Sequence, residues 1–169
     1  PNGEEIVRLI AFVFISIMYA GFWLALAVLF SVFFRRTATS MLASLAVWIV
    51  FFFFVAAIAG AIADAAAPVD ANSSVDAFTR NASIEGTLAR ISPCTLYGEA
   101  TIGLLTPEVG TMNSALYVMS YYSGRMSNPL PLHDSLLLVW PQMVTIIALC
   151  AICFAVSYIR FMREEIRSI

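Results

Sequence analysis

The chain contains no lysine, and three long stretches contain no charged residue at all. These stretches are 26, 27 and 25 residues long and comprise Leu9–Phe34, Thr37–Ala63 and Ser135–Ile159. A hydrocarbon layer about 30 Å thick requires roughly 20 apolar residues of helix to cross it. Because lipid offers the backbone no hydrogen-bond partners, each stretch is predicted to be a transmembrane helix. The net charge of −2 gives no indication of nucleic-acid binding.

The uncharged stretches also lack the groups that several membrane functions require. Carriers driven by ions and voltage sensors bury acids, bases or histidines in their spans. Intramembrane proteases need aspartates or a His-Glu-x-x-His pair at depth. No Gly-x-x-x-x-Gly-Lys-Ser/Thr loop is present, so no Walker-type ATP site is expected on this chain. If the protein moves a substrate, the energy is expected to come from another chain or from a part missing here. No catalytic residue, cofactor or metal ion is therefore predicted, and the chain is not predicted to be an enzyme.

Cysteine and histidine are scarce, which weakens the remaining catalytic interpretations. Cys150 and Cys153 form a C-x-x-C, but a zinc site needs two more ligands and Cys94 is predicted to lie outside the membrane. Packing is the favoured role of this pair. For His133 and Asp134, a helix-start role of the aspartate is favoured over a catalytic pair, which would need a nucleophile as well.

The distribution of arginine predicts the orientation of the spans. Arg35 and Arg36 lie in a short turn between the first two spans, and three more arginines follow the third span, namely Arg160, Arg163 and Arg167. Cytoplasmic loops carry an excess of basic residues, so these segments and the C-terminus are expected in the cytoplasm. The intervening 64–134 segment has seven acids against three arginines and is expected outside. Arg8, at the outer end of the first span, is expected to extend to the lipid headgroups.

These inferences define an all-α membrane protein with three transmembrane helices and short external or re-entrant helices between the second and third. We expect one partial transmembrane domain over residues 1–169, multi-pass in the plasma membrane, with a mean hydropathy of +0.88. Its predicted parts are spans at about 7–34, 38–63 and 135–160, an external helical segment at 64–134, and a cytoplasmic tail at 161–169. The chain begins with Pro1 and has an odd number of spans, so it is interpreted as part of a longer protein.

Short helices are expected within the external segment. One amphipathic helix is predicted, with these apolar residues on one face: Val75, Phe78, Ile84, Leu88 and Ile91. Ser92-Pro93 and Thr106-Pro107 are helix-start signals. Met112–Tyr122 is apolar but too short to span. A small globular cap above the membrane remains the alternative.

Local signals refine the spans. Thr37, Thr39 or Ser40 is expected to cap the second span, and Ala56 with Gly60 suggests close packing against another helix. Pro141 is expected to kink the third span or to mark where it begins. Polar residues inside the spans are candidates to line a path or, preferably, to join helices by hydrogen bonds: Ser16, Tyr19, Ser44, Gln142 and Thr145. Asn72-Ser-Ser and Asn81-Ala-Ser are glycosylation sequons.

Four segments together resemble a known family. They are 22–39, which contains Phe-Phe-Arg-Arg-Thr; 91–107, which contains Ile-Ser-Pro-Cys-Thr-Leu-Tyr-Gly-Glu; the Leu-Val-Trp-Pro of 138–141; and the tail 153–167, which contains Tyr-Ile-Arg-Phe-Met-Arg-Glu-Glu. The chain resembles the C-terminal half of an ABC-2 type transporter permease, of the kind related to the nitrous-oxide-reductase maturation (Nos) permeases. The resemblance extends over nearly the whole chain.

The resemblance implies a permease subunit of an exporter, with six spans in the full protein, a separate ATP-binding ABC subunit as partner, and a second permease copy. This chain lacks the family's first three spans. Candidate contacts with the ATPase are therefore the basic residues at the predicted cytoplasmic side, with topology-setting charge as an equal alternative: Arg35, Arg36, Arg160 and Arg163. The runner-up function is a non-transporting membrane scaffold or assembly factor with an external helical cap.

Overall fold

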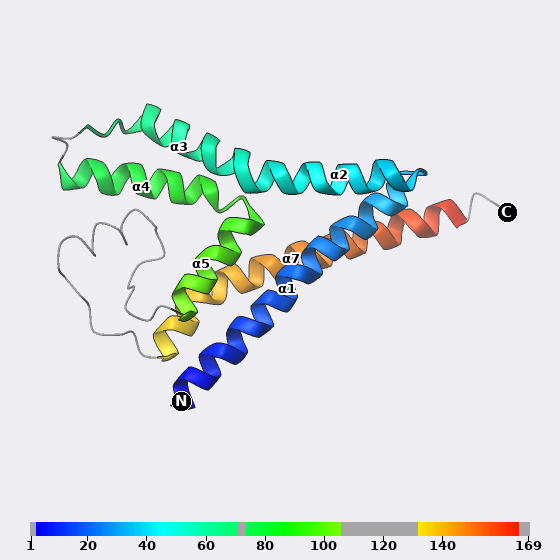
Figure 1. Ribbon diagram of the computed structural model, residues 1–169, viewed down its shortest axis with the longest axis horizontal. Coiled ribbons are helices and arrows are strands. Elements are labelled where there is room, and N and C mark those ends of the chain that lie inside the picture. Colours follow the sequence, from blue (N-terminus) through cyan, green and yellow to red (C-terminus); the bar gives the residue numbers. More distant parts are fainter. Residues whose placement is uncertain (1–2, 71–73, 106–131, 166–169) are drawn as a thin grey trace.

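A computed structural model describes residues 3–70, 74–105 and 132–165. For residues 164 and 165 it describes the backbone alone. This part of the chain is helical and contains no strand (Figure 1). Its elements are α1 (Gly3–Phe33), α2 (Thr37–Ile49), the π-helical turn η1 (Val50–Phe54), α3 (Val55–Ala66), α4 (Val75–Ala89), α5 (Pro93–Leu105) and α7 (Leu132–Glu165). Three helices are long and apolar enough to cross a membrane, Gly3–Phe33, Thr37–Ala66 and Leu132–Arg163. The prediction of an all-α membrane protein with three such helices is confirmed.

The helices α1 and α7 run in the same direction and pack along their length, with α5 antiparallel to both (Figure 1). At the first end, Arg8 of α1 contacts Ser135 near the start of α7. At the other end, the guanidinium of Arg160 lies 5.3 Å from the centre of the Phe33 ring. The rod formed by α2, η1 and α3 lies apart from this bundle for most of its length, and α4 runs back antiparallel along α3.

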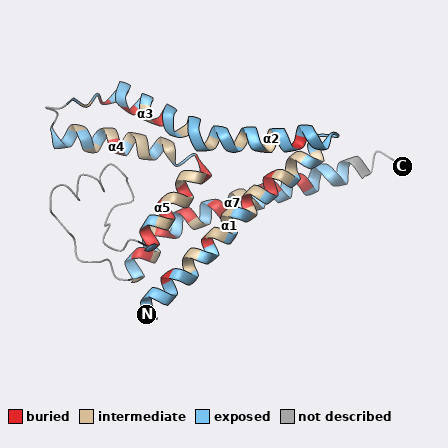
Figure 2. Ribbon diagram, viewed as in Figure 1, coloured by how far each residue is buried: buried red, intermediate tan, exposed pale blue. Residues whose placement is uncertain are grey.

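The hydrophobic core is formed by α1, α5 and α7, and the buried residues of Figure 2 concentrate there. One cluster joins Phe22 of α1, Leu96 of α5 and Ile146 of α7. A second cluster, nearer the start of α1, joins Ile15 and Val139 through Leu104 of α5. The two long apolar helices therefore pack against α5 as well as against each other.

The second candidate span has a different environment. Only 6% of its most apolar window is buried, compared with 22% for each of the other two. Its buried residues in α3 are Ala59 and Ala63, and the buried Ala82 lies on the neighbouring α4. A side-chain carbon added at Gly60 would lie 3.9 Å from Glu85 Oε1 of α4. The small residues of this span thus bring α3 close to α4 rather than to another span.

The predicted helix starts have mixed outcomes. Pro93 is the first residue of α5, and the Ser92 hydroxyl accepts a hydrogen bond from the Cys94 amide at 3.2 Å, as Ser-Pro predicted. For α2 the expected threonine or serine cap at Thr37, Thr39 or Ser40 is wrong. Arg36 is the N-cap residue, its extended backbone begins the helix, and it makes no side-chain capping bond. This helix start is exposed, so water can satisfy its amides.

The third span does not begin at its proline. Pro141 lies inside α7, and the helix continues on both sides of it. The Thr145 hydroxyl, one turn further along the same helix, donates to the Pro141 carbonyl at 2.8 Å. The expected helix start at Thr106-Pro107, the apolar stretch Met112–Tyr122 and the sequon at Asn72 lie outside the described residues.

Candidate functional site

The turn between α4 and α5 meets the second candidate span at its middle. Three backbone hydrogen bonds form the turn, from the amides of Arg90, Ile91 and Ser92 to carbonyls in the last turn of α4. The Ser92 hydroxyl then donates to the Phe51 carbonyl at 2.9 Å. Phe51 belongs to η1, near the midpoint of the helix Thr37–Ala66. The segment 90–92 therefore contacts the middle of a candidate span instead of its end.

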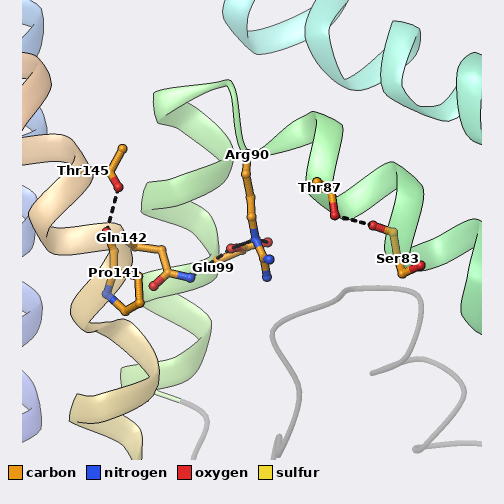
Figure 3. Close-up of polar contacts among 7 residues, drawn as sticks. All are labelled: Ser83, Thr87, Arg90, Glu99, Pro141, Gln142 and Thr145. Carbon is orange, nitrogen blue, oxygen red and sulfur yellow. Dashed lines mark hydrogen bonds and ion pairs between the residues drawn. The ribbon is translucent and has the colours of Figure 1, made fainter.

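A buried carboxylate lies next to this turn (Figure 3). Arg90 Nε donates to Glu99 Oε2 at 2.9 Å and to Oε1 at 3.1 Å. Gln142 Nε2 of α7 donates to the same Oε2 at 3.2 Å. The Glu99 side chain is 8% exposed and that of Arg90 is 45% exposed. Because a buried charge is costly unless it is paired and hydrogen-bonded, these contacts explain how an acid is accommodated between α5 and α7.

An aromatic and polar cluster joins α1 to the first turns of α5. The rings of Tyr19 and Tyr97 are stacked, with centroids 4.4 Å apart and planes 10° from parallel. The Tyr97 and Ser16 hydroxyls are 2.9 Å apart and share a hydrogen bond. The Tyr19 hydroxyl donates to Cys94 Sγ at 3.3 Å. Offset aromatic stacking adds to the burial of these rings, so the cluster fixes the position of α5 along α1.

Arg8 joins the three helices at the opposite end of α5. Its Nη1 donates to Ser135 Oγ at 2.9 Å and to the Leu104 carbonyl at 3.3 Å. The residue is 8% exposed. The expectation that Arg8 extends to the lipid headgroups is therefore wrong, because α5 and α7 supply buried oxygen partners within reach of its guanidinium.

The polar residues predicted inside the spans separate into two groups. Ser44 and Thr145 donate to carbonyls of their own helices, at Ser40 and Pro141. The other three, Ser16, Tyr19 and Gln142, contact side chains of α5. The sequence reasoning missed their partners, which are Cys94, Tyr97 and Glu99. One signal marks this segment, since Glu99 is the only charged residue among the mostly apolar residues 93–105.

The four arginines expected to contact an ATPase lie at one end of the described structure. Arg35 and Arg36 follow the end of α1 directly, and Arg160 lies over Phe33 in the last turn of that helix. Arg163 follows three residues later in α7. All four are exposed. The fold therefore brings two arginine pairs that are distant in the sequence to the same side of the molecule.

The two cysteines of the C-x-x-C pair and His133 all lie in α7. Cys153 is part of the core cluster with Phe22 and Ile146, and Cys150 Sγ lies 4.0 Å from the position of a carbon added at Gly21. His133 is exposed at the start of α7. Within residues 3–70, 74–105 and 132–165, no three His, Cys, Asp or Glu side chains gather as metal ligands do.

The chain matches the model of one known protein family. The family described as ABC-2 family transporter protein matches residues 1–166, which is almost the entire chain. Members of this family are generally non-catalytic membrane components. No curated protein and no solved structure matches the chain at a similarity that carries an argument. With three apolar helices of spanning length and a match over nearly all its residues, the chain belongs to the ABC-2 family of transporter proteins.

Proposed function

We propose that this chain is the membrane-path part of an ABC exporter permease, powered by a separate ATP-hydrolysing subunit and paired with a second copy of itself. The observation that carries the proposal is the family match over residues 1–166. The exposed second span supports the pairing, because most of its apolar surface has no partner within the described residues. Such a surface contacts lipid or another protein helix in the assembled permease.

The arginine-rich end is proposed to face the cytoplasm and the ATPase. Basic residues are retained on the cytoplasmic side of a membrane, and Arg35, Arg36, Arg160 and Arg163 all lie at this end. In this orientation α4 starts at the outer side, runs inward along α3, and returns outward as α5. The α4–α5 pair is then a re-entrant hairpin whose turn reaches the middle of the membrane.

The orientation is tested by labelling single cysteines from outside the cell. The native cysteines are replaced by serine or alanine, and a cysteine is placed at position 36, 80 or 165 of the full-length protein. A membrane-impermeant maleimide is expected to label position 80 but neither of the other two. Labelling of position 36 without position 80 would reverse the proposed topology.

The partnership is tested by copurification of the full-length permease with the ATPase encoded next to it. Arg35→Glu combined with Arg36→Glu is expected to reduce the recovered ATPase about tenfold or more, as loss of a charged contact does. Arg80→Glu on α4 is the control, because it reverses one arginine charge at an exposed site away from this end, and each single variant, Arg35→Glu or Arg36→Glu, is compared with it. A wild-type protein that recovers no ATPase would favour the scaffold function instead.

A further inference from the structure

The guanidinium of Arg90 lies unusually far from either end of the spans. Arg90 is two residues from Ser92, whose hydroxyl is bonded to the Phe51 carbonyl. Phe51 is near the midpoint of Thr37–Ala66, so it is roughly 20 Å along the helix from each end. A helix of this length covers the hydrocarbon layer. In the proposed membrane position, Arg90 therefore lies near the centre of that layer.

Arg90 has unused donors at this depth. Only its Nε is bonded to Glu99, and among the described residues its two terminal amino groups make no hydrogen bond. The side chain is 45% exposed, whereas Glu99 behind it is buried. An ionised guanidinium is not stable against lipid tails, and charged groups at membrane depth face water-filled cavities or substrate pathways. The exposed side of Arg90 thus marks a polar region inside the membrane.

Apolar surface is present at the same level. The turn η1, whose carbonyl holds Ser92, exposes three consecutive phenylalanines, Phe52, Phe53 and Phe54. A cationic group with planar, paired donors recognises phosphate and carboxylate groups in particular. A cation at the same level of the membrane as exposed aromatic surface suits a molecule with an anionic head and an apolar chain.

We propose that Arg90 is the anion-recognition residue of the transport path, and that its terminal amino groups bind the phosphate or carboxylate head of an amphipathic cargo. This proposal rests on the permease function and specifies its substrate class. Glu99 and Gln142 are positioning residues, because Glu99 holds Nε of the guanidinium and Gln142 fixes Glu99 to α7. The Glu99 charge also offsets part of the Arg90 charge, so it limits how tightly the anion is held and allows its release.

The test measures binding of dodecyl phosphate to the full-length permease–ATPase complex in phosphatidylcholine nanodiscs, by calorimetry. Dodecyltrimethylammonium and inorganic phosphate are the head-group and chain controls, and both are expected to bind more weakly. R90Q is expected to weaken dodecyl phosphate binding by about tenfold or more, the usual effect of losing a hydrogen bond to a charged group. R90K is expected to retain part of the affinity, and R80Q, on the same helix, all of it.

The variant E99Q distinguishes recognition of an anion from a structural role of the pair. Its amide oxygen still accepts from Arg90 Nε, while the compensating negative charge is removed. Binding of dodecyl phosphate is therefore expected to become tighter, whereas simple damage to the hairpin would weaken it. Binding by E99Q also tests whether Arg90 recognises the anion if R90Q does not fold. Unchanged or weaker binding by E99Q, or equal binding by R90Q and wild type, overturns the proposal.

Two further readouts separate the possible explanations. Nanodiscs containing phosphatidylglycerol are expected to compete with dodecyl phosphate if the anionic head comes from a membrane lipid, and to leave its binding unchanged if the cargo is a soluble amphiphile. Copurification of the ATPase is expected to be the same for R90Q and wild type. If R90Q retains the ATPase and binds dodecyl phosphate as tightly as the wild type, the anion site alone is rejected. If the wild type itself recovers no ATPase, the permease function is rejected.

Discussion

The Ser92 hydroxyl donates to the Phe51 carbonyl at 2.9 Å across 41 residues of sequence. Phe51 lies in a π-helical turn, and such turns release backbone groups from the regular α-helical pattern. In a membrane those groups have no water to bind, so serine hydroxyls commonly satisfy them. The same hydroxyl accepts from the Cys94 amide and so begins α5. One side chain thus both starts a helix and attaches it to a neighbouring span.

Replacement of this hydroxyl is the first prediction. Ser92→Ala is expected to lower the free energy of unfolding by about 1–2 kcal/mol, because it removes one helix cap and leaves the partly buried Phe51 carbonyl without this donor. Thermal denaturation in mild detergent, followed by circular dichroism, measures the change. Ser83→Ala is the control, since that exposed hydroxyl donates only to the Arg80 carbonyl of its own helix. Equal losses in the two variants would contradict a special role for Ser92.

Arg8 provides the second prediction. Arg8→Gln is expected to destabilise the described bundle by about 1.5–3 kcal/mol, because a charged donor is lost from Ser135 and from the Leu104 carbonyl. The measurement is the same thermal denaturation. Arg36→Gln removes an exposed arginine and is expected to have little effect. If the two variants are equally stable, the contacts of Arg8 contribute nothing measurable.

Hydrophobic length alone was sufficient to predict the three spanning helices. The thickness of the bilayer fixes how many apolar residues a span needs, and the uncharged runs exceed that number. The start of α5 was also predictable, because the Ser-Pro pair acts on adjacent backbone. These successes share a physical cause, since each depends on residues that are close in the sequence.

The buried polar contacts could not be predicted in the same way. The uncharged interior of the runs suggested a bundle without charge, yet Glu99 from outside the runs lies against Gln142 of the third span. Arg8 was expected to reach the lipid headgroups, because the spacing of residues along the chain does not reveal that Ser135, 127 residues away, lies within hydrogen-bond distance. Both contacts depend on where a returning helix packs, which is a property of three-dimensional arrangement that no local spacing encodes.

The close approach of α3 and α4 yields the third prediction. Ala63 is fully buried in α3, on the side where that helix packs against α4. Ala63→Leu is expected to cost about 1–3 kcal/mol, because added methyl groups force packed helices apart. Ala57→Leu introduces the same side chain at an exposed position of α3 and is expected to be nearly neutral. The comparison again uses thermal denaturation, and similar stabilities of the two variants would argue against tight α3–α4 packing.

The side-chain amide of Asn81 donates two hydrogen bonds in the folded protein, which leads to the last prediction. Nδ2 donates to Asp64 Oδ1 at 3.0 Å and to the carbonyl of Ala67, the C-cap residue of α3, at 2.9 Å. Glycosylation replaces a hydrogen of this amide nitrogen with a bulky sugar, so it would remove one of these bonds and separate α3 from α4. The sequon is therefore expected to stay unmodified in the folded protein, even in a host that glycosylates.

The experiment uses the full-length protein carrying Asn72→Gln, so that the other sequon of the segment cannot contribute. Expression in a glycosylating eukaryotic host is expected to give no endoglycosidase-sensitive shift from Asn81, as judged by gel mobility and intact mass. Asn81→Ala is expected to lower the free energy of unfolding by about 1–2 kcal/mol, since the carbonyl of the C-cap residue Ala67 loses its donor. A shift that disappears in Asn81→Gln would show that this amide is accessible, and that α4 does not hold the end of α3.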